Sequence, residues 1–108
     1  MGASSHAERQ WRAIATVETR AGTDLSGLAA CERYDVRVEP VDGSPAGCRW
    51  FNVLIDAARG EEHYVLAARA VLRTLHRLRA SGVATGFHVV DGNQWLAWYG
   101  ADSRHAEC

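Results

Sequence analysis

The chain has no lysine, no internal repeat and no long apolar run. All twelve of its basic residues are arginines, which we interpret as the codon bias of a GC-rich, bacterial genome because the bias extends over the whole chain. No apolar stretch approaches the roughly 20 residues that a transmembrane helix needs. The formal net charge of −1 provides little electrostatic attraction to nucleic acid or to an anionic membrane.

Motifs for metal or nucleotide binding are also missing. Zinc sites need ligands at close, repeated spacings, whereas Cys31, Cys48 and Cys108 lie far apart and the five histidines are scattered. There is no Walker loop and no Gly-x-Gly-x-x-Gly fingerprint, and the chain resembles no family that we recognise. We therefore predict no metal, no cofactor and no catalytic residue, and we favour a protein that is not an enzyme. The odd number of cysteines and the lack of an apolar leader predict a cytoplasmic protein with free thiols.

The composition is that of one small globular domain. The chain has 108 residues, of which 47% are hydrophobic and 23% charged, and these values are typical of a domain that folds alone. The polar ends contrast with the middle of the chain. We expect flexible tails at residues 1–10 and 101–108 and a single domain over residues 11–100.

Three stretches alternate between apolar and polar residues with the period of two that is typical of half-buried strands. They span residues 11–19, 34–41 and 48–57, and the turn-rich residues 42–47 connect the second and third as a hairpin. In the first stretch, the odd-numbered residues from 11 to 17 are expected to share one face. Residues 23–31 fit a short helix or a loop about equally well.

Residues 61–80 are predicted to form the one long helix. Apolar residues recur there at three- and four-residue spacing, among them Tyr64, Val71 and Leu75. Acidic residues occur in the first turn and arginines in the last, as the helix dipole favours. Gly82 is suited to terminate this helix.

A second hairpin is predicted over residues 83–99, closed by Asp91 and Gly92. Without a bulge, its pairing places Phe87 and Trp98 on one face and His88, Trp95 and Tyr99 on the other; a bulge would break this parity. Both faces are then apolar. Because only one face can cover the core, the other is expected to bury against a ligand, a partner or a second copy of the chain.

These elements predict an α+β fold: an antiparallel-rich sheet of about five strands with the long amphipathic helix packed on one face. A ferredoxin-like arrangement with one extra strand would fit their order. The second sheet face is expected to carry the functional residues, namely Arg37, Trp50, Asn52, His88, Trp95 and Tyr99.

Three functions are compatible with this prediction. The leading hypothesis is a small interaction module that forms a homodimer or binds a protein partner through the aromatic sheet face, since tryptophan, tyrosine and arginine are enriched at interfaces. The alternative is a small-molecule binder or modest enzyme that uses the same face as a pocket. A further alternative is nucleic-acid binding along the helix by Arg69, Arg73 and Arg77, which the net charge of −1 disfavours. No membrane association is expected.

Overall fold

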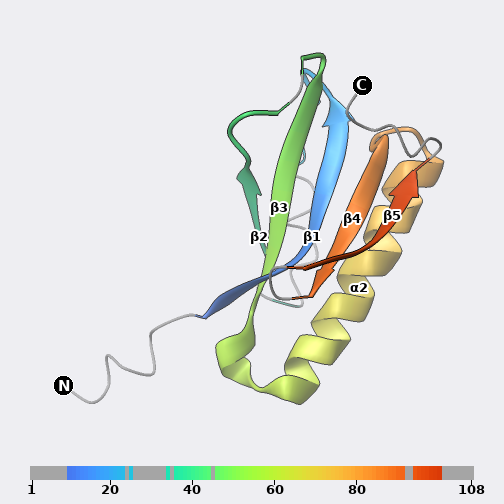
Figure 1. Ribbon diagram of the computed structural model, residues 1–108. Helices are drawn as coiled ribbons and strands as arrows, with labels where there is room; N and C mark the ends of the chain where they lie inside the picture. Colours follow the sequence, from blue (N-terminus) through green and yellow to red (C-terminus); the bar gives the residue numbers. More distant parts are fainter. Residues whose placement is uncertain are drawn as a thin grey trace.

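The chain folds as an α+β domain in which a long helix covers one face of an antiparallel sheet (Figure 1). The structure, a computed structural model, describes residues 10–23, 25, 34, 36–44, 46–91 and 94–100. Along these residues the elements are β1 (Trp11–Arg20), β2 (Val36–Pro40), β3 (Cys48–Asp56), the 3₁₀ helix η2 (Ala57–Arg59), α2 (Glu61–Ala80), β4 (Gly86–Asp91) and β5 (Gln94–Gly100).

The sheet has the strand order β2-β3-β1-β4-β5, and each pair of neighbours is antiparallel. The strand β1 therefore lies at the centre, and β2 and β5 form the edges. This confirms the predicted α+β class with a five-stranded antiparallel sheet. A ferredoxin-like fold also requires a helix between the first two strands, and residues 26–33 lie outside the described part of the chain. That topology thus stays a prediction, as do the helix or loop at 23–31 and both tails.

The helix α2 begins and ends as its sequence predicts. Glu61 and Glu62 lie in its first turn and two arginines in its last turn, where they complement the helix dipole. After the helix, the backbone N–H of Gly82 donates to the carbonyl oxygen of Arg79 at 3.1 Å. Gly82 has a φ of 84°, a left-handed conformation that glycine adopts without steric cost.

The core lies between α2 and the sheet. The helix buries residues at three- and four-residue spacing, Tyr64, Ala67, Val71 and Leu75. The sheet contributes side chains that alternate along the three central strands: Ala15, Val17, Phe51, Val53, Ile55 and Phe87. Burying a valine, leucine, isoleucine or phenylalanine side chain of this core stabilises the fold by about 1.5–3 kcal/mol. The opposite face of the sheet, which we call the far face, carries the side chains of the residues that alternate with these along each strand.

A β-bulge in β1 changes which of its side chains lie against α2. Arg12 pairs with Ile55 and Ala15 pairs with Val53, with a register shift between them. The extra residue places Arg12 on the same face as Ala15, because Ile55 and Val53 share the helix side of β3. The prediction that the odd-numbered residues from 11 to 17 share one face is therefore wrong for the first two of them.

Cys48 is disulfide-bonded, and its partner lies outside the described residues. The prediction of a free thiol is therefore wrong at this position. The odd number of cysteines favoured free thiols, but an odd number does not show which cysteines lie close together in the fold. No helix in the described part of the chain is long and apolar enough to span a membrane.

Candidate functional site

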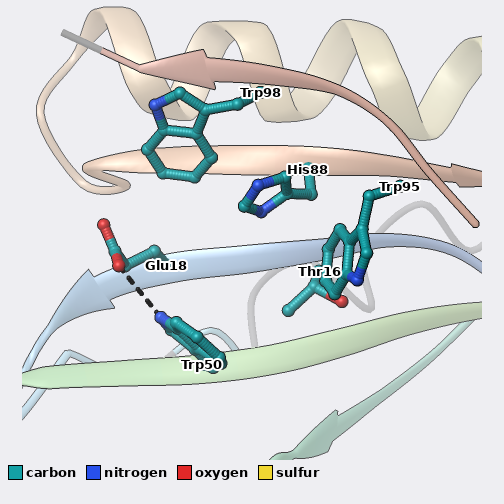
Figure 2. Close-up of a pocket in the computed structure, with 6 residues that line it drawn as sticks. All are labelled: Thr16, Glu18, Trp50, His88, Trp95 and Trp98. Atoms are coloured by element: carbon teal, nitrogen blue, oxygen red, sulfur yellow. Dashed lines mark hydrogen bonds between the residues drawn. The ribbon is translucent and has the colours of Figure 1, made fainter. Parts of the chain in front are cut away.

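The far face carries a pocket of about 440 Å³. Figure 2 shows its six lining residues on the side of the sheet turned away from α2. They come from four neighbouring strands: Thr16 and Glu18 from β1, Trp50 from β3, His88 from β4, and Trp95 and Trp98 from β5. We call this site the tryptophan pocket.

Glu18 places a carboxylate at the floor of the tryptophan pocket. Its side chain is only 3% exposed. The indole Nε1 of Trp50 donates a hydrogen bond to Oε2 at 2.9 Å, and the Thr85 hydroxyl lies 2.9 Å from Oε1. The backbone N–H of Thr85 also donates to the carbonyl oxygen of Glu18 at 2.8 Å. These contacts fix the carboxylate in one position, because both of its oxygens have a partner.

Trp98 rests on two paired glycines. Gly86 and Gly100 lie opposite each other in β4 and β5. A Cβ on Gly86 would lie 2.2 Å from the indole Cη2, and a Cβ on Gly100 would lie 2.5 Å from Cζ2. No other residue type leaves room for the indole at these positions, since such contacts are far shorter than van der Waals separations. The two glycines thus hold the Trp98 ring close against the sheet.

His88 packs between two tryptophans of the neighbouring strand. Its ring centroid lies 4.2 Å from that of Trp95, in an edge-to-face arrangement, and 4.7 Å from that of Trp98. Such contacts between rings stabilise their relative orientation beyond the burial of area. The wall of the pocket formed by β4 and β5 is therefore a packed group of three rings.

The structure brings together three of the predicted binding residues: Trp50, His88 and Trp95 all line the tryptophan pocket. Asn52 lies on the same face beside it. Its Oδ1 accepts a hydrogen bond from the hydroxyl of Thr16 at 2.7 Å. Asn52 therefore positions a lining residue without lining the pocket itself.

Arg37 lies on the far face but away from the pocket, on the edge strand β2. Its Nε is 2.6 Å from Oε2 of Glu39 in an exposed ion pair. Its guanidinium carbon also lies 5.7 Å from the centroid of the Trp11 ring. Arg37 was predicted to belong to the aromatic site, but it does not line the tryptophan pocket.

The prediction that Tyr99 shares a face with His88 is wrong. A register shift between Val89 and Val90 places Tyr99 opposite Phe87 and Trp98 opposite His88. The ring of Tyr99 packs 5.2 Å from that of Phe87, on the helix side. The bulge exchanges the faces of all residues beyond it, because side chains alternate along a strand.

The three arginines of the nucleic-acid alternative, Arg69, Arg73 and Arg77, are exposed on α2. They lie on the side of the helix opposite its buried stripe, at a spacing of four residues. This arrangement is equally typical of a solvated helix face.

Sequence reasoning missed Thr16, Glu18 and Trp98 as pocket residues. Two polar side chains in the middle of an apolar strand were the available signal for Thr16 and Glu18. For Trp98, the signal was the pair of glycines at 86 and 100, which leave space for a large ring. Neither signal identifies a pocket until β1 is known to be the central strand.

Comparison with known proteins found no matching family model, no similar curated protein and no similar solved structure. Among the residues that the structure describes, no group of three or more histidine, cysteine, aspartate or glutamate side chains is arranged to hold a metal ion. The geometry of the tryptophan pocket is therefore the feature of the described residues that bears on function.

Proposed function

We propose that this protein binds a small organic molecule in the tryptophan pocket. The observation that carries the proposal is the combination of three indoles, one imidazole and a buried carboxylate around about 440 Å³ of space. Ligand pockets commonly have volumes of about 300–1,000 Å³ and aromatic walls with a few placed polar groups. Of the functions expected from the sequence, the geometry supports this one best.

Preorganisation also supports the proposal. The Trp98 ring packs on two glycines, and the Glu18 carboxylate is held by hydrogen bonds from β3 and from the loop before β4. A site whose side chains are already fixed loses little conformational entropy when a ligand binds. A face that served only to cover the core would have no need of a buried carboxylate among its rings, because burying a charge is costly.

The test is a fragment screen followed through the indole N–H signals in nuclear magnetic resonance spectra. The chain has four tryptophans, and ligands are expected to shift the signals of the three in the pocket but not that of Trp11. Trp95→Leu should weaken binding at least about tenfold, because Trp95 supplies one wall. Trp11→Leu is the matched control and should leave binding unchanged. Fragments that shift all four signals equally, or none, would contradict the proposal.

Self-association through β5 is the second candidate function. Its specific observation is that this edge strand leaves Trp95 55% and Leu96 58% exposed. The other edge, β2, ends in Pro40 and carries an exposed ion pair, features that discourage pairing between edges. Light scattering across a dilution series should then show a dimer that Leu96→Glu dissociates. A monomer at all concentrations would exclude this candidate.

Three further expectations stay predictions. Nucleic-acid binding by the α2 arginines would require an affinity that falls steeply with salt. Enzymatic activity is not favoured by any feature of the tryptophan pocket over simple binding. A cytoplasmic location is opposed by the disulfide at Cys48, since disulfides persist mainly in oxidising compartments.

A further inference from the structure

Glu18 is the one acidic side chain among the residues that line the tryptophan pocket. Its carboxylate is almost fully buried, and its two hydrogen-bond partners, the Trp50 indole and the Thr85 hydroxyl, are neutral donors. Neutral donors solvate a carboxylate without cancelling its charge. A buried charge that is not neutralised is costly. A positively charged ligand close to Glu18 would therefore be attracted to the carboxylate and would neutralise its charge.

The rings of the pocket have the complementary property. The face of an indole is electron-rich, and tryptophan is the best side chain for binding a cation over a ring. Figure 2 shows the indole of Trp98 over the sheet, with Trp50 across the space from it and Trp95 at the end away from Glu18. The paired glycines lie beneath the Trp98 ring, which lines the pocket. Aromatic side chains that line a space with a carboxylate at one end suit an alkylated ammonium group, whose methyl groups contact the rings.

We infer that the ligand of the tryptophan pocket is an organic cation of the alkylated ammonium class. The inference rests on the proposed function, since it assigns a ligand class to the same site. The positive charge distinguishes this ligand from a neutral aromatic ligand, which would stack on the rings without a need for Glu18. It also excludes an anion, which the Glu18 carboxylate would repel.

The experiment compares two probes of the same shape in the full chain by calorimetric titration. Choline is the cationic probe, and neohexanol, in which a carbon atom replaces the ammonium nitrogen, is its neutral counterpart. Choline is expected to bind at least about tenfold more tightly, from the attraction of its charge to the rings and to Glu18. Glu18→Gln, which keeps the shape of the side chain and an acceptor for Trp50, should remove most of that difference and leave neohexanol unaffected.

The outcomes separate the inference from the proposed function. Equal binding of the two probes at the indoles would overturn the cationic ligand and leave the proposed pocket intact. Binding of choline that Glu18→Gln does not weaken would also overturn the inference. If neither probe binds, the inference fails, and the fragment screen alone decides on the pocket. Should Glu18→Gln not fold, the comparison of choline with neohexanol in the unaltered protein still tests the inference.

Discussion

Replacing Gly86 with alanine is expected to displace the Trp98 indole and to lower the free energy of unfolding. The new Cβ would lie 2.2 Å from Cη2 and 2.3 Å from Cζ2 of the ring, whereas carbon atoms in contact are about 3.5–4.0 Å apart. The ring must therefore move away from the sheet by about 1.5 Å. Overfilling a packed site in this way costs about 1–3 kcal/mol, which we expect as the loss of stability.

The assay is urea denaturation of a double-mutant cycle that combines Gly86→Ala with Trp98→Ala. Without the ring, the added methyl group has space, and alanine stabilises a strand relative to glycine by about 0.5–1 kcal/mol. The two substitutions should therefore couple by about 2 kcal/mol, as residues in contact do. Identical effects of Gly86→Ala in both backgrounds would refute the packing of Trp98 on Gly86.

Three other substitutions test the remaining parts of the structure by the same denaturation assay. Trp50→Phe removes the donor to Glu18 and should cost about 1–3 kcal/mol, because it leaves a buried acceptor without a partner; a cost near zero would contradict that hydrogen bond. Leu75→Ala should cost about 2–5 kcal/mol, since Leu75 is fully buried in the core, whereas its control on the same helix, Leu66→Ala, should cost less than about 1 kcal/mol because Leu66 is 46% exposed. Cys48→Ala should cost about 2–4 kcal/mol by removing a disulfide, and an unchanged midpoint would argue against the bridge.

The secondary structure could be predicted because its signals are local. The predicted helix at residues 61–80 has the bounds of α2, and the predicted strands at 11–19 and 48–57 match β1 and β3 to within one residue at each end. Apolar periodicity and turn residues act over a few positions, so they can be interpreted without the rest of the fold. The sheet class followed from the number and spacing of these elements.

The assignment of side chains to faces was less successful. The bulges in β1 and β5 each insert one residue, and nothing in composition marks that residue. The prediction for the face of Tyr99 was wrong for this reason. His88 precedes the bulge along the chain, and its side chain was assigned to the correct face. The carboxylate of Glu18 was missed for another reason, since only the central position of β1 brings it between Trp50 and Trp98.

The bulge in β5 has a consequence for how this site could diversify. Leu96 is the extra residue between the pairs Val90–Trp95 and Val89–Ala97. If Leu96 instead paired with Val89 and the bulge were lost, plain alternation would turn a phenol, Tyr99, toward the ligand in place of the Trp98 indole. The register of β5 thus sets the chemistry of the binding wall, whereas deletion of Leu96 would leave Trp98 in the pocket, because the pairs on both sides of the bulge stay the same.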